Sequence, residues 1–176
     1  MREWWLRTLL VLQAPRPVFA ALRDDSDDSA GDRAEPVLLV VWLAGMALAF
    51  GSGAAGTYHG DGLLLLVWMF LAGGITGTAA YWFFGAVLYG SARALGSAGS
   101  YRRARHVLAF ASVPIAISLV LAPAGHAVFR WLLLPFVAWA AVLLVIGVRS
   151  VHGWTWARAA AAAIVPAVAA GVLLAL

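Results

Sequence analysis

The side chains in this sequence that could do chemistry are few, and their spacing matches no catalytic motif. The chain has no cysteine, which excludes a disulfide, a thiolate zinc site and a cysteine nucleophile. A hydrolase would need a nucleophile beside a base, or paired carboxylates. Ser112 follows His106 by six residues, about 600° of helical rotation or about 240° net, so these side chains face apart on one helix. His126 or His152 could approach Ser112 only through the fold, so we expect no catalytic residue, no cofactor and no enzyme activity.

A second group of reactive side chains is acidic. Carboxylates crowd into residues 24–35 together with serine and glycine, and we expect residues 24–36 to form a solvated, flexible linker. The alternative is a docking patch for a basic partner or a loose cation site, although the spacing is not that of an EF-hand. His59 and Asp61 share a short loop, but two residues are too few to predict a metal site. The acidic residues are Asp24, Asp25, Asp27, Asp28, Asp32 and Glu35.

The basic residues are all arginine, and several follow a short Gly/Ser loop at residues 96–100. Near an anionic membrane surface each could contribute about 1 kcal/mol by contacting lipid headgroups. The alternative is that they only fix the orientation of the chain in the membrane. The net charge of +4 does not indicate nucleic-acid binding, because the arginines sit at membrane edges and not on one face. The candidate headgroup contacts are Arg102, Arg103, Arg105 and Arg149.

The elements that position these residues must be membrane helices. The chain is 64% hydrophobic and only 11% charged, whereas soluble domains are about 45–50% apolar and about 25% charged. The bilayer is therefore its solvent, and we predict an all-α integral membrane bundle of five transmembrane helices. The predicted spans are residues 37–53, 62–90, 107–124, 127–148 and 159–176.

The second span is unusually long. Its 29 residues would reach about 43 Å, more than the ~30 Å hydrocarbon core. Dividing it at Gly73 and Gly74 leaves pieces of 11 and 16 residues, each shorter than the ~17 that a span requires. We therefore predict one long helix that projects beyond the bilayer.

The spans carry two further patterns. Small residues recur at four-residue spacing, which predicts faces where two helix backbones approach closely. The last three spans each contain a proline, and proline can kink a membrane helix because it lacks a backbone donor. The predicted packing positions are Gly45, Ala49, Gly73 and Gly77, and the predicted kinks are at Pro114, Pro135 and Pro166.

The N-terminal region, residues 1–23, is amphipathic. The apolar run Leu9–Leu12 is too short for a cleaved signal peptide, which needs about 7–15 apolar residues. We expect an interfacial helix with Trp4 and Trp5 in the headgroup layer. Eleven of the twelve arginines fall on one predicted side of the membrane, and only Arg130 falls on the other. This asymmetry predicts a cytoplasmic N-terminus and an extracytoplasmic C-terminus. We expect the cell (inner) membrane of a bacterium, because arginine without lysine, together with many alanines and glycines, is typical of GC-rich bacterial coding sequences.

Several loose motifs occur together along the chain. They are Pro15-Arg16-Pro17-Val18-Phe19, the run from Gly99-Ser100-Tyr101-Arg102 through Ala111-Ser112-Val113-Pro114, Trp139, the loop Gly147–Gly153, and Pro166. Their order resembles the Yip membrane-protein family, named for interaction with Ypt/Rab GTPases, in its short bacterial form. The resemblance covers the chain from about Leu9 to Leu176, and the acidic linker has no counterpart in it.

The resemblance implies a fold and not an activity. Eukaryotic members act as adaptors in vesicle trafficking, but a bacterial chain has no known Rab cycle to join. We expect a non-catalytic scaffold or adaptor that engages lipids or other membrane proteins. A homo-oligomer, in which the partner is another copy of the chain, is the remaining alternative. The alternative is a channel or transporter for small or lipid-like molecules. Ion coupling is disfavoured, because the predicted spans contain no acidic residue and their single arginine lies at an edge.

Overall fold

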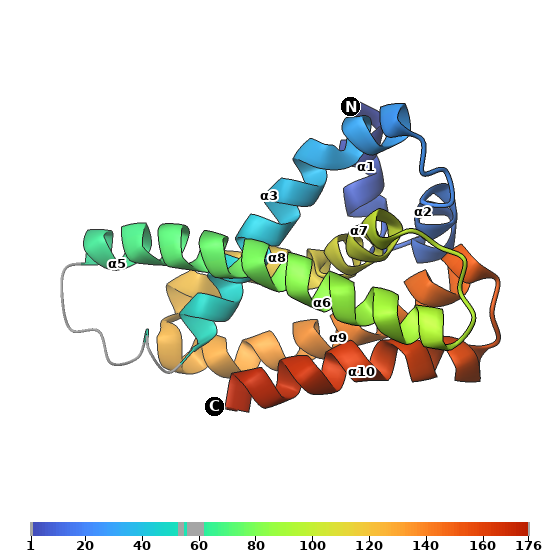
Figure 1. The fold of residues 1–176 in the computed structure, drawn as a ribbon. Helices are drawn as coiled ribbons and strands as arrows, with labels where there is room; N and C mark the ends of the chain where they lie inside the picture. Colours follow the sequence, from blue (N-terminus) through green and yellow to red (C-terminus); the bar gives the residue numbers. More distant parts are fainter. Residues whose placement is uncertain (1, 53–54, 56–61, 176) are drawn as a thin grey trace.

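The computed structural model describes residues 2–52, 55 and 62–175, and these form a bundle of helices (Figure 1). No strand occurs among them, so the predicted all-α class is confirmed. The loop with His59 and Asp61, and the ends of the first and last predicted spans at Gly53 and Leu176, lie outside the described residues. The elements are α1 (Arg2–Leu10), α2 (Pro15–Ala21), α3 (Asp27–Gly51), α5 (Gly62–Trp68), the π-helix η1 (Met69–Gly73), α6 (Gly74–Ala94), α7 (Tyr101–Ala111), α8 (Val113–Ser118), the 3₁₀-helix η2 (Leu119–Ala124), α9 (His126–His152) and α10 (Trp156–Ala175).

The protein is a helical membrane bundle. Within the described residues, four helical stretches are long and apolar enough to cross a bilayer, and Trp156–Ala169 adds a shorter apolar helix. The four stretches are Asp27–Gly51, Gly62–Ala94, Tyr101–Ala124 and His126–His152. Each of the four helical stretches begins at or before the predicted start of its span, because the polar residues that precede the apolar run are helical as well.

The long second span is one continuous helix, as predicted. Gly62–Ala94 contains 33 residues and changes from α to π geometry only over Met69–Gly73. The π segment ends where Trp42 of α3 lies against Gly74, since a Cβ on Gly74 would come within 1.9 Å of the Trp42 ring. A π turn inserts one extra residue into an α-helix, which locally offsets the register of the faces on either side. Beyond it, α5 extends past the other helices and buries no residue (Figure 1).

The predicted flexible linker is wrong over most of its length. Helix α3 begins at Asp27, ten residues before the predicted span, and Pro36 lies inside it and not at its start. Ser26 caps the helix by accepting a hydrogen bond from the Ser29 amide, and Asp27 and Asp28 occupy the first turn, where negative charge is favourable. An acidic composition predicts disorder only while the charges stay unpaired, and here Arg33 of α3 and Arg102 of α7 pair with Asp25 and Asp27.

The N-terminal region also departs from the prediction. It folds into two short helices, and Trp4 is buried with its ring 5.7 Å from that of Phe110. Trp4 therefore packs against other residues of the bundle and not against lipid, whereas Trp5 is exposed. Helix α2 is fixed by Phe19, which is fully buried against Gly147 of α9; a Cβ on Gly147 would lie 2.9 Å from the Phe19 ring. Burial of these aromatic rings outweighs the preference of tryptophan for an interface.

Of the three prolines predicted to kink the spans, one lies where the helix is interrupted and two lie within continuous helices. At Pro114 the helix is interrupted, since α7 ends at Ala111 and α8 begins at Val113 with the proline in its first turn. Proline cannot donate to the carbonyl four residues earlier, so this position suits a helix start. Pro135 and Pro166 instead lie within α9 and α10, which continue through them without a break in helix assignment.

The basic segments of the chain meet at one end of the bundle. Arg23 donates to the carbonyl oxygen of Ser150 over 3.0 Å, and Arg158 donates to that of Leu95 over 3.0 Å. Arg103 reaches the carbonyl oxygen of Arg23 over 2.7 Å. These contacts tie the N-terminal helices, the turn after α6 and the turn after α9 together (Figure 1, right). We call this the basic end.

Candidate functional site

An apolar pocket of about 270 Å³ lies between the membrane helices. Its walls come from α3, α6, α7, α9 and α10, together with Ser112, which lies between α7 and α8, and Ile115 of α8. Nearly all of the lining is aliphatic or aromatic, and the Ser112 hydroxyl donates to the carbonyl oxygen of Ala109 over 2.8 Å. An apolar cavity of about 150 Å³ is large enough to bind benzene. The pocket can therefore hold part of a hydrocarbon chain.

One wall of the pocket is the crossing of α3 and α6. A Cβ on Gly45 would lie 2.1 Å from the Gly73 carbonyl oxygen and 2.7 Å from the Gly77 Cα. A Cβ on Gly73 would lie 2.7 Å from the Cα of Met46. The structure thus brings three of the four predicted packing residues together, backbone against backbone. Ala49, the fourth, lies about one turn further along α3 and is half-buried.

Arg105 lies above the pocket in a cage of aromatic rings. Its guanidinium carbon is 3.6 Å from the ring centre of Trp82, 4.7 Å from that of Tyr101 and 5.2 Å from that of Tyr81. Its Nε is buried and has no hydrogen-bond partner among the described residues. Ring faces attract a cation but accept its N–H groups only weakly. The cage therefore holds the guanidinium in place without giving its N–H groups strong hydrogen-bond acceptors.

Gly85 of α6 makes room for this arginine. A Cβ on Gly85 would come within 2.3 Å of the Arg105 Cγ, so the arginine side chain crosses α6 directly over the glycine. Any larger residue would push the guanidinium out of the cage. Gly85 is thus a positioning residue for Arg105.

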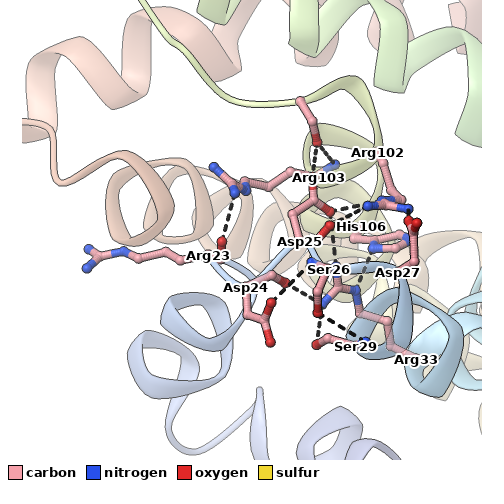
Figure 2. A network of polar contacts seen from close by, with 11 residues as sticks. Arg23, Asp24, Asp25, Ser26, Asp27, Ser29, Arg33, Arg102, Arg103 and His106 are labelled. Carbon is pink, nitrogen blue, oxygen red and sulfur yellow. Dashed lines mark hydrogen bonds and ion pairs between the residues drawn. The ribbon is translucent and has the colours of Figure 1, made fainter.

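A network of charged side chains fastens α3 to α7 at the basic end (Figure 2). At its centre is Arg33, which is fully buried. Its Nε donates to Nδ1 of His106 over 2.7 Å, and its terminal nitrogens donate to the Asp24 carbonyl oxygen over 2.8 Å, the Ser29 hydroxyl over 3.1 Å and an Asp25 carboxylate oxygen over 3.2 Å. A buried arginine is tolerated because its donors are satisfied in this way.

Asp25 connects this network to the N-terminal end of α7. Its carboxylate lies 3.0 Å from Nε of Arg102 and accepts a hydrogen bond from the Ser100 hydroxyl, and Arg102 also reaches Asp27 over 2.6 Å. Burial alone would raise the pKa of the Asp25 carboxyl. The hydrogen bonds from Ser100 and Arg102 and the nearby positive charge outweigh that effect and lower the pKa below its ordinary value.

The side chains of the charged network hold α3 and α7 together. His106 accepts from Arg33 and so is engaged, and it does not approach Ser112 in any contact that the structure describes. Among the described residues, no group of three histidine, aspartate or glutamate side chains could hold a metal ion. The acidic segment, whose alternative prediction was a docking patch, directs Asp25 and Asp27 to arginines of the same chain.

The four arginines predicted to contact lipid headgroups have four different surroundings. Arg102 is paired with carboxylates, and Arg103 donates to the Arg23 backbone. Arg105 is caged by rings, and Arg149 stacks 4.4 Å from the ring centre of Trp156. The structure thus separates Arg105, which lies over the pocket residue Tyr81, from its neighbours in the sequence.

Sequence reasoning missed two residues that shape the site, Arg33 and Gly85. Arg33 falls within the predicted acidic linker, although a lone arginine just before an apolar run could have suggested a buried partner for the aspartates. Tyr81, which belongs both to the cage and to the pocket wall, is an aromatic residue for which the sequence allows core packing, an interfacial anchor or a place in a groove. Gly85 carried no signal, because one glycine in a glycine-rich span is unremarkable.

The family model described as the Yip1 domain matches residues 9–176, nearly the whole chain. The matched range contains the pocket, the caged arginine and the charged network. Comparison with curated proteins and with solved structures finds no match. The Yip family is not a known family of enzymes.

Proposed function

The chain belongs to the Yip1-domain family of membrane proteins, and we propose that it is a non-catalytic membrane scaffold that holds a lipid acyl chain between its spans. The observation that carries this proposal is the apolar pocket of about 270 Å³ inside the membrane-spanning bundle. In a bilayer the most abundant apolar molecules are lipid chains, and a pocket lined by hydrocarbon favours them over water. A protein that holds lipid in this way would contribute to membrane organisation without chemistry.

We also propose the orientation and membrane that the sequence predicts, with the N-terminus in the cytoplasm of a bacterial cell. Supporting this, the three arginine-rich segments lie together at the basic end, as segments on one side of a membrane must. A second copy of the chain or another membrane protein remains part of the scaffold proposal. The projecting α5, with Leu64 and Trp68 exposed, supports it as a surface for such contact.

A carrier for lipid-like molecules is the second candidate. It is favoured by the placement of Ser112, where the third span is interrupted, and Pro166, inside the last helix, in the wall of the same pocket. Helices broken or weakened at a binding site are common in transporters. Flux of a fluorescent lipid across liposomes containing the protein would favour the carrier over the scaffold.

The test of the pocket is to fill it. Ala140 of α9 is buried and lines the pocket, so Ala140→Phe places a ring inside it, whereas Ala138→Phe places the same ring on the exposed face of the same helix. We expect native mass spectrometry from mild detergent to show bound lipid on the wild type and on Ala138→Phe, and several-fold less on Ala140→Phe. Equal lipid on all three proteins, with unchanged circular dichroism, contradicts the proposal.

A further inference from the structure

We propose that the lipid held by this protein is a phospholipid whose phosphate contacts Arg105 while one acyl chain occupies the pocket. This inference rests on the proposed function and names its ligand. Three features carry it: the register of α7, the unsatisfied guanidinium of Arg105, and the side chain of Tyr81 that joins the cage to the pocket.

The register of α7 places Arg105 directly over the pocket. Leu108, Ala109 and Ser112 line the pocket and follow Arg105 by three, four and seven residues. Residues at these spacings share one face of an α-helix. With a rise of ~1.5 Å per residue, Arg105 stands about 4–10 Å from these residues along the helix, toward the basic end. A cation at the membrane edge above an apolar cavity has the layout of a phospholipid, with its phosphate above its chains.

The guanidinium of Arg105 is held in place but lacks an anion. None of the ion pairs among the described residues involves it, whereas Arg102, three residues earlier, is paired with Asp25 and Asp27. The Tyr101 hydroxyl of the cage donates to the Trp82 carbonyl oxygen over 2.8 Å, and no hydrogen bond from Arg105 to it is found among the described residues. A phosphate supplies the missing acceptors, and arginine binds phosphate through two parallel hydrogen bonds.

The cage and the pocket form one continuous site. Tyr81 lies under the Arg105 guanidinium and also lines the pocket, and Gly85, one turn further along α6, leaves the space that the arginine side chain crosses. Arg103 and Arg149 also bury an Nε without a hydrogen-bond partner, but Arg103 donates to the Arg23 carbonyl oxygen, and Arg149 stacks on Trp156, which does not line the pocket. Arg105 does not line the pocket either, but it lies over Tyr81, which does, and this contact distinguishes it from the other cations of the basic end.

The test compares two lipids that differ only in the phosphate headgroup. Purified protein is equilibrated in detergent micelles with equal amounts of dioleoylphosphatidylglycerol and dioleoylglycerol, and bound lipid is counted by native mass spectrometry. We expect the wild type to retain about fivefold more of the phospholipid, the factor that corresponds to the ~1 kcal/mol of one basic residue near an anionic lipid. Arg105→Gln should bring this ratio to about one, and Arg16→Gln, which removes an equal charge from the exposed face of α2, should leave it unchanged.

The outcomes separate this inference from the proposed function. Equal retention of both lipids by the wild type, or an unchanged ratio in Arg105→Gln, overturns the phosphate site and leaves the acyl-chain pocket standing. Retention of neither lipid overturns both. If Arg105→Gln does not fold, Gly85→Ala keeps the charge but displaces the side chain from its cage, and it should lower the ratio; an unchanged ratio there also overturns the inference. Inorganic phosphate added as a competitor should not displace the bound phospholipid, and displacement by it would contradict a site that needs the chain.

Discussion

At the scale of single residues, the basic end depends on charges that satisfy one another. Arg33 is fully buried, and the side chain of Asp25 is only 14% exposed in its ion pair with Arg33. Removing one member of a buried pair leaves the other uncompensated, which costs more than the pair itself contributes. The network therefore makes α3 and α7 mutually dependent, and its strength should follow the ionisation of Asp25.

We predict that acid weakens the protein through Asp25. Because the folded-state pKa of Asp25 is lowered, its stabilising effect is present above its ordinary pKa of 3.8 and is lost as the pH falls through the lowered value. Asp25→Asn should therefore lower the free energy of unfolding by about 1–3 kcal/mol at pH 7, and the gap to the wild type should narrow by pH 3. The measurement is thermal unfolding in detergent across this pH range.

The control for this prediction is Asp28→Asn, which removes a nearby carboxylate, in the first turn of α3, that is exposed to solvent. It should change the melting temperature by much less than Asp25→Asn does at pH 7. A gap between Asp25→Asn and the wild type that stays constant from pH 7 to pH 3 would show that the Asp25 charge does not stabilise the fold.

At the scale of elements, the bundle is organised by the crossing of α3 and α6. Close approach of two backbones removes lipid from between the helices and increases van der Waals contact, which is the main source of helix association in a membrane. The same crossing forms a wall of the pocket through Gly45 and Gly77. Packing and lipid binding thus depend on the same glycines.

We predict opposite effects for one substitution at two glycines of α6. A Cβ on Gly77 would lie 2.7 Å from the Val41 carbonyl oxygen, so Gly77→Ala should destabilise the protein by about 1–3 kcal/mol. A Cβ on Gly90 would meet nothing within 4 Å, so Gly90→Ala should be neutral or stabilising by up to about 1 kcal/mol through helix propensity. The free energy of unfolding, measured by titration with a denaturing detergent, reports both effects. A Gly77→Ala protein as stable as the wild type would contradict the tight crossing of α3 and α6.

At the scale of the whole molecule, the polar groups concentrate at one end and the pocket opens between apolar spans. This polarity is what a membrane imposes, because charged groups are costly in the hydrocarbon layer and favourable at its edge. In the phospholipid site proposed above, the caged arginine lies at the level of the headgroups and the pocket at the level of the chains. The orientation of the molecule then decides which leaflet supplies the lipid.

We predict that the basic end faces the cytoplasm. The chain has no cysteine, so single cysteines report position without background labelling. Ala98, in the turn after α6, and Ala124, at the end of η2, are both exposed and lie toward opposite ends of the third span. In intact cells a membrane-impermeant maleimide should label Ala124→Cys and not Ala98→Cys, and permeabilisation should expose Ala98→Cys. The reverse pattern would place the basic end outside.

The sequence by itself determined the membrane class, the helical spans and the close packing of glycines. These follow from local properties: apolar run length, the scarcity of charge within the spans, and the four-residue spacing of Gly73 and Gly77. The family could also be recognised, because its motifs are short and keep their order along the chain. The unbroken second span followed from length alone, since neither half could cross a bilayer.

The tertiary structure decided how the charges are used. Arg33 and His106 are 73 residues apart in the sequence, and Asp25 and Arg102 are 77 apart, so no local pattern could pair them. That pairing turned a predicted linker into the first turns of α3, and burial against Phe110 drew Trp4 away from the interface. The cage of Arg105 and the pocket below it likewise exist only where α6 and α7 pack together, because each helix supplies half of the contacts and neither encloses a cavity alone.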